Sequence, residues 1–153
     1  MEKGNYKKFG LMMLASFITM YALMFINASA WDHIMLSNTR TYMAICMIAA
    51  MAIIMLLFML NMYKNKKMNA AILIGSAIIF IGVFTMLRKQ TAISDVQWMQ
   101  GMIPHHSSAI MTSKNAHLKD PEAIKLAEEI IEAQKREIAQ MKKMIYRLEN
   151  ESK

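Results

Sequence analysis

Two methionines and two histidines lie close together in residues 98–106. Met99, Met102 and His106 are spaced at i, i+3 and i+7, so a helix would place them on one face. Pro104 fits such a helix if it lies in the first turn, where its missing N–H is not needed. Thioether and imidazole ligands together favour a soft metal ion such as Cu(I). The segment therefore predicts a metal site.

The composition excludes a disulfide scaffold and argues against nucleic acid as a partner. Methionine accounts for 19 of the 153 residues, whereas Cys46 is the single cysteine. The net charge of +7 arises in residues 1–90, which contain nine Lys and Arg against two acids. Residues 91–153 contain nine of each. Because the basic excess lies beside apolar segments, we expect membrane lipid as a partner, and no nucleic acid.

Three apolar segments without internal charges are each close to the ~20 residues that cross a bilayer as a helix. They cover residues 9–28, 42–62 and 70–87, which predicts a membrane domain over residues 1–89 and an outer domain over residues 90–153. Lysines cluster before the first segment and between the second and third. By the positive-inside rule, the N-terminus is cytoplasmic and the C-terminal domain lies outside the cytoplasmic (inner) membrane.

The first apolar segment has an alternative interpretation as a signal peptide. A lysine-containing start, an apolar stretch and small residues at 28 and 30 resemble a signal that is cleaved after Ala30. The apolar stretch is longer than the ~7–15 residues of a typical signal core, which favours its retention. Both alternatives place the C-terminal domain outside.

Methionines recur at intervals of four along the second apolar segment. Each interval exceeds one helical turn by about 40°, so the series winds slowly around a helix over roughly 24 Å. We favour packing as its role, with methionine in place of leucine. The alternative is a relay that passes Cu(I) between thioethers across the bilayer. The residues of this ladder are Met43, Met47, Met51, Met55 and Met59.

The outer domain is predicted to be an antiparallel helical hairpin. Its first helix extends from about Ser94 to Leu118, with a possible bend or restart at Gly101 and Pro104. Residues 120–122 provide the N-cap and first turn of a second helix, which has an apolar heptad seam. Because ~60 residues bury little core alone, we expect two hairpins from two protomers to form a four-helix bundle.

The second helix returns toward the Met–His segment. Met141 is expected near Met99 and Met102, which makes it a further ligand. Gln134 is the polar residue in an otherwise apolar seam. It is either a buried amide that sets the register or a partner that orients a ligating histidine.

The histidines are expected to differ in their roles. His105 and His106 project about 100° apart on a helix, and His106 is the first choice because it shares the methionine face. His117 lies roughly 16 Å from His106 by helical rise, which favours a helix-end residue over a ligand of the same site. Glu137 is more typical of a solvated position than of a ligand. The candidate ligands are therefore Met99, Met102, His105, His106 and Met141, with Gln134, Glu137 and His117 as outer-shell or alternative ligands.

Residues 99–106, 120–122 and 128–141 together closely resemble the bacterial family known as domain of unknown function 305. The resemblance covers about residues 95–148, and its Gly-Met-Ile-Pro-His-His core is specific. It implies a ferritin-like helical bundle outside the cytoplasmic membrane and, for some members, copper binding and copper tolerance. The matching positions are Met102, His105, His106, Gln134, Glu137 and Met141. Many members have alanine or acidic residues where this chain has Ser107 and Ser108.

We expect an all-α, non-enzymatic protein. The sequence offers no evident nucleophile with a base, no Gly-rich phosphate loop and no Glu-x-x-His repeats for a di-iron site. The leading interpretation is a membrane-anchored, homo-oligomeric copper-binding protein that sequesters or relays Cu(I), or less favourably Cu(II), in copper homeostasis. The alternatives are a copper transporter that uses the methionine ladder and a metal-free oligomerisation or scaffold module.

Overall fold

The computed structural model describes residues 2–151, and every regular element within this range is a helix. The all-α prediction is therefore confirmed. The chain divides into two units. The first contains the residues up to 23 together with residues 40–91, and the second contains residues 24–39 together with the C-terminal residues from 92 onward.

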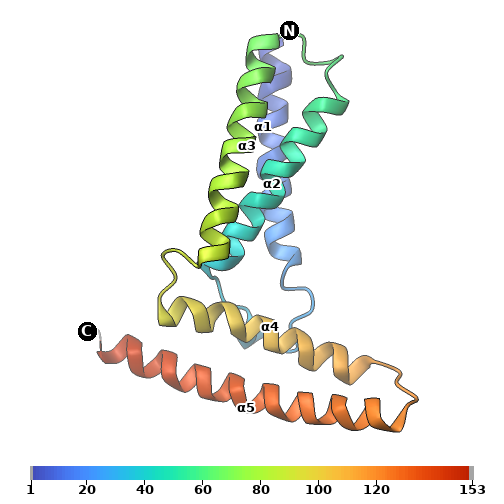
Figure 1. Ribbon diagram of the computed structural model, residues 1–153, viewed down its shortest axis with the longest axis vertical. Helices are drawn as coiled ribbons and strands as arrows, with labels where there is room; N and C mark the ends of the chain where they lie inside the picture. Colours follow the sequence, from blue (N-terminus) through green and yellow to red (C-terminus); the bar gives the residue numbers. More distant parts are fainter. Residues whose placement is uncertain (1, 152–153) are drawn as a thin grey trace. The chain divides into compact units, whose positions relative to one another are not determined.

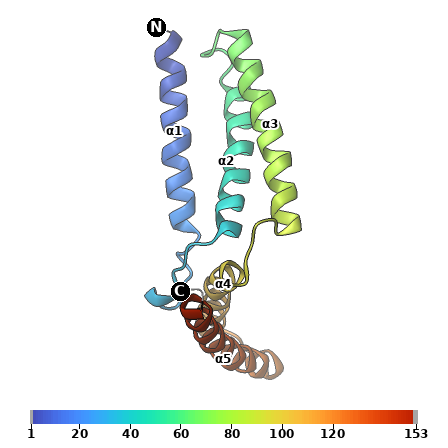
Figure 2. The ribbon, with the colours of Figure 1, turned by 90° about the vertical axis from the view of Figure 1, so that its left-hand side faces the viewer.

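Three helices lie side by side in the first unit (Figures 1 and 2). They are α1 (Glu2–Leu23), α2 (Asn38–Phe58) and α3 (Lys66–Lys89). With 21 and 24 residues, α2 and α3 are about 31 and 36 Å long. Both are long and apolar enough to cross a membrane, by length and composition.

The first predicted membrane segment needs correction. The helix ends at Leu23 and residues 24–27 form a turn, so the expected helical segment 9–28 is too long at its C-terminal end. Its apolar part, residues 9–23, rises about 22 Å as a helix, less than the ~30 Å of a bilayer core. Among the described helices, two rather than three therefore meet the length and apolarity expected of a membrane span.

The first unit has an apolar core at the end where α2 is connected to α3. Phe9 and Met13 of α1 are buried with Ala52 and Leu56 of α2 and with Tyr63. A polar cluster adjoins this core. The Tyr6 hydroxyl lies 2.7 Å from Asn69 Oδ1, and Asn69 Nδ2 donates to the Tyr63 carbonyl at 2.6 Å. Asn69 is thus buried with its polar groups satisfied.

The second unit contains the antiparallel hairpin of α4 (Asp95–Asn115) and α5 (Pro121–Glu151) (Figure 1). Side-chain caps start both helices, because Ser94 accepts a hydrogen bond from Gln97 N and Asp120 accepts one from Ala123 N. Residues 95–115 form one helix that includes Pro104, so the helix does not restart there.

The core of the hairpin lies between the second half of α5 and the buried face of α4. It is formed by Met99, Ile103, Ile110, Ile138, Met141 and Ile145. The heptad seam is therefore covered in its C-terminal half, whereas Ile124 near its start is 40% exposed.

Residues 24–39 pack on the hairpin and contain the short helix η1 (Trp31–His33). We call them the first connection. A Cβ atom on Gly101 would lie 3.3 Å from Ser37 Oγ, so glycine permits this close approach. The sequence-based boundary at residues 89 and 90 did not anticipate that the first connection groups with the outer hairpin.

Candidate metal site in the helical hairpin

Thioethers gather in the core of the hairpin. Met99 and Met141 are 3% and 5% exposed, and they come from opposite helices. Met102 is half-buried and packs against the same cluster. The structure thus brings together the three methionines that the sequence predicted as ligands.

His106 connects the two helices. Its side chain is 11% exposed, and its Nε2 lies 2.7 Å from Glu137 Oε2 of α5. Its Nδ1 lies 3.0 Å from the backbone oxygen of Met102. Both ring nitrogens of His106 therefore lie within hydrogen-bond distance of an oxygen atom. A metal ion bound at either nitrogen would replace one of these two contacts.

The structure places the other predicted ligands elsewhere. His105 is exposed, although its ring centroid is 6.3 Å from that of His106. His117 is exposed in the connection between α4 and α5, beyond the end of α4. Gln134 is half-buried on α5. Glu137 is the one predicted outer-shell residue with a direct contact to His106, and its side chain is 45% exposed.

The chemistry of the available donors restricts the kind of metal. Within residues 2–151, no group of three or more His, Cys, Asp and Glu is placed to hold a metal ion. The soft donors in the core of the hairpin are the thioethers of its methionines. Thioethers with one imidazole fit Cu(I) better than Zn(II) or Mg(II).

Ser107 attaches the first connection to α4. Its side chain is fully buried. Its Oγ accepts a hydrogen bond from Ser29 N at 2.7 Å and lies 2.9 Å from both Ser29 Oγ and His33 Nδ1. The sequence analysis did not predict this cluster. The sequence feature that pointed to it was Ser107 itself, which follows the histidine pair at a position where many family members have another residue.

Electrostatics reinforce this attachment. Asp32 of the first connection forms an ion pair with Lys142 of α5. This hydrogen bond with Lys142 lowers the pKa of Asp32 from its ordinary value. Burial, and then the positive charge of Lys142, lower the pKa of His33. A neutral His33 can accept a hydrogen bond from the Ser107 hydroxyl at Nδ1, which agrees with the 2.9 Å between Nδ1 and Oγ.

Ser107, His33 and Asp32 have the residue types of a hydrolase triad, but the geometry does not support catalysis. Ser107 has no exposed surface from which its oxygen could attack a substrate. His33 Nε2 is 3.9 Å from Asp32 Oδ1, which is too long for an orienting hydrogen bond. The cluster is therefore structural.

The methionine ladder does not lie in one environment, and its last residue, Met59, follows the end of α2 at Phe58, so the predicted helical segment 42–62 is too long at its C-terminal end. Met43 and Met47 are 42% and 38% exposed, whereas the three later residues pack against the core of the first unit. The advance of about 40° per step explains this change, because four steps turn the series through roughly 160°. The arrangement supports packing for Met51, Met55 and Met59.

Fold and site together define an all-helical protein with two potential membrane-crossing helices and a hairpin whose core contains Met99 and Met141. Residues 83–145, which include α4 and most of α5, match the family described as Domain of unknown function (DUF305). The chain is also similar to an uncharacterized protein of Acanthamoeba polyphaga mimivirus, with 36% identity over 138 residues, 88% of this chain and 89% of the relative. No solved structure matches. The chain belongs to the DUF305 family, as the sequence motifs predicted.

Proposed function

We propose that this protein binds copper at the outer face of the cytoplasmic membrane, where it sequesters or relays Cu(I) in copper homeostasis. One observation carries the proposal: Met99 and Met141 are buried in one cluster, against which Met102 packs. Met102 lies one helical turn before His106 on α4. The ligands of the ion would come from this group of residues. Such soft, mostly neutral ligands favour a monovalent soft ion over Zn(II).

The test is a competition titration of the full chain in lipid nanodiscs, with bicinchoninate as the Cu(I) competitor. We expect stoichiometric Cu(I) binding that is tighter than Zn(II) binding under the same conditions. Equal or tighter Zn(II) binding would contradict a methionine-based site. Absence of any bound metal would leave the scaffold alternative as the better explanation.

Single histidine variants resolve the role of each imidazole. His106→Ala is expected to weaken Cu(I) binding by about tenfold or more, because the buried ring lies one helical turn from Met102, whose backbone oxygen is 3.0 Å from its Nδ1. His105→Ala is a matched control, since the neighbouring ring is exposed. His117→Ala should also leave copper binding unchanged. A loss in His117→Ala equal to that in His106→Ala, with folding preserved, would refute this assignment.

We propose three membrane crossings, with α1 as the third crossing helix: its apolar part is short, but all 22 residues of α1 together rise about 33 Å. The support is the distribution of charge: six lysines lie near the proposed cytoplasmic ends of the segments, against three Lys and Arg near the outer ends. Three crossings place α4 and α5 outside.

We also propose that the protein is a homo-oligomer. Ile124 in the heptad seam and Leu118 are 40% and 41% exposed, so a second hairpin would cover apolar surface there. On α3, a Cβ atom added to Gly75 or Gly82 would meet no other atom within 4 Å, which leaves room for a close helix neighbour. Cross-linking in nanodiscs between cysteines introduced at Ile124 tests this contact, and a strictly monomeric product contradicts it.

A further inference from the structure

A fourth methionine belongs to the thioether cluster of the hairpin. Met144 of α5 packs against the core that contains Met99 and Met141, as Met102 does from α4. Met141 and Met144 are at positions i and i+3, so they are neighbours on one helix face. No motif in the sequence distinguished Met144 from the other methionines of this chain.

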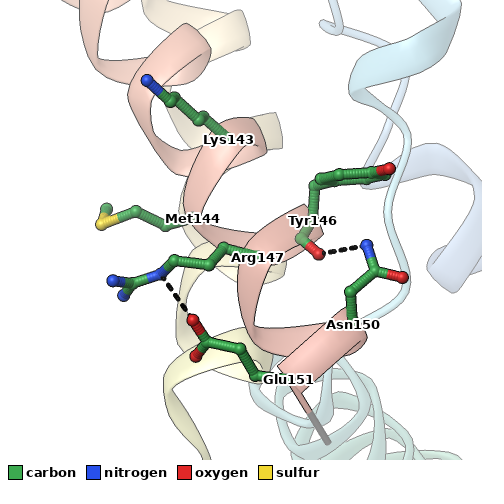
Figure 3. A pocket seen from close by; sticks show the side chains of 6 residues that line it. All are labelled: Lys143, Met144, Tyr146, Arg147, Asn150 and Glu151. Carbon is green, nitrogen blue, oxygen red and sulfur yellow. Dashed lines mark hydrogen bonds and ion pairs between the residues drawn. The ribbon is translucent and has the colours of Figure 1, made fainter. Parts of the chain in front are cut away.

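Met144 also reaches a cavity, which distinguishes it from the buried methionines. The cavity has a volume of about 560 Å³ and lies along the last turns of α5 (Figure 3). Met144 is half-buried, whereas Met99 and Met141 are almost completely buried. The cavity is lined by Lys143, Met144, Tyr146, Arg147, Asn150 and Glu151. Met144 thus packs against the buried cluster and also lines the open cavity.

The charges at the cavity do not exclude a monovalent cation. Arg147 Nε lies 3.9 Å from Glu151 Oε1, so a carboxylate partly offsets the guanidinium. Lys143 is exposed, and solvent and salt screen its charge. The thioether of Met144 remains a neutral, soft donor beside these groups.

We propose that Met144 is a further Cu(I) ligand and forms the open side of the copper site, facing the cavity. The inference rests on the proposed function, because it adds a ligand to the same site. The buried sulfur atoms of Met99 and Met141 have little contact with solvent, so a half-buried fourth thioether provides the position at which an arriving ion first meets the cluster.

The first experiment compares Met144→Leu with the wild-type full chain in nanodiscs. Leucine conserves volume and hydrophobicity, so folding should persist. We expect Cu(I) affinity to fall by about tenfold or more and the X-ray absorption spectrum of bound Cu(I) to show one sulfur ligand fewer. Met111→Leu on α4 is the matched control, because Met111 lies outside the buried cluster and should leave both measurements unchanged.

A second measurement does not depend on a variant. Hydrogen peroxide should oxidise Met144 faster than Met99 and Met141, and redox-inert Ag(I) should protect it. An unchanged affinity and sulfur count in Met144→Leu, or oxidation of Met144 that saturating Ag(I) does not slow, would overturn the proposal. A wild-type protein that binds neither Cu(I) nor Ag(I) would instead overturn the proposed function itself.

Discussion

Replacing Ser107 with alanine should release the first connection from the hairpin. The hydroxyl of Ser107 is fully buried and is the common partner of Ser29 N, Ser29 Oγ and His33 Nδ1, at 2.7, 2.9 and 2.9 Å. Ser107→Ala removes all three contacts without adding volume. The effect should therefore be a local opening of residues 24–39 rather than unfolding of α4 and α5.

The contacts set the size of the effect. Each hydrogen bond contributes about 0.5–1.5 kcal/mol net, and a buried group left without a partner costs about 1–3 kcal/mol. Ser29 is exposed and regains water, whereas the His33 side chain is 14% exposed and regains less. We therefore expect a loss of about 2 kcal/mol, which raises the open population of the first connection roughly 30-fold.

Hydrogen–deuterium exchange of the full chain in nanodiscs measures this population directly, because local openings control exchange of the backbone amides. Amides of the first connection should exchange roughly 30-fold faster in Ser107→Ala, whereas amides of α5 should change little. Ser108→Ala is the matched control, since the adjacent hydroxyl lies outside this cluster. Equal exchange of residues 24–39 in both variants would refute the view that Ser107 holds the connection.

Three further predictions concern pH, the ladder and topology. Because the pKa of His33 is lowered from its ordinary value of 6.5, the folded state binds fewer protons than the unfolded state. Docking of the first connection is then fully stabilised above pH 6.5 and weakens as the pH falls through the lowered pKa. Hydrogen–deuterium exchange of residues 24–39 at several pH values, corrected for intrinsic exchange, measures this pH dependence. His33→Asn keeps a hydrogen-bond acceptor but does not titrate, so it should remove the dependence. A dependence that persists in this variant would refute the assignment to His33. The second variant replaces four ladder methionines by leucine: Met47, Met51, Met55 and Met59. If these residues only pack, folding and cellular copper accumulation should not change. Lost copper accumulation in a folded variant would favour the transporter. A reporter that is active only outside the cytoplasm should be active when it is fused to the C-terminus. Activity of a cytoplasm-specific reporter at the same position would contradict the proposed topology.

Periodicity and capping residues predicted both helices of the hairpin and where they start, but α4 ends at Asn115 and not at the expected Leu118. Asp120 and Pro121 marked the start of α5, and the structure begins the helix there, because an N-cap and a first-turn proline act through their own backbone neighbours. The ends of the apolar segments were less certain. Hydrophobicity does not determine where a helix stops, and α1 ends at Leu23 although apolar residues continue beyond it.

Helix geometry likewise placed Met99, Met102 and His106 together, because residues at i, i+3 and i+7 share a face in any helix. Contacts between distant segments depended on the tertiary structure. The first connection follows α1 by sequence, yet it packs on α4 through Ser107, 78 residues from Ser29. Met144 lies three positions after Met141, but only the packing of α4 on α5 places it against the cluster that contains Met99. Local patterns report which face a side chain occupies, whereas the partner opposite that face is selected by packing across the whole fold.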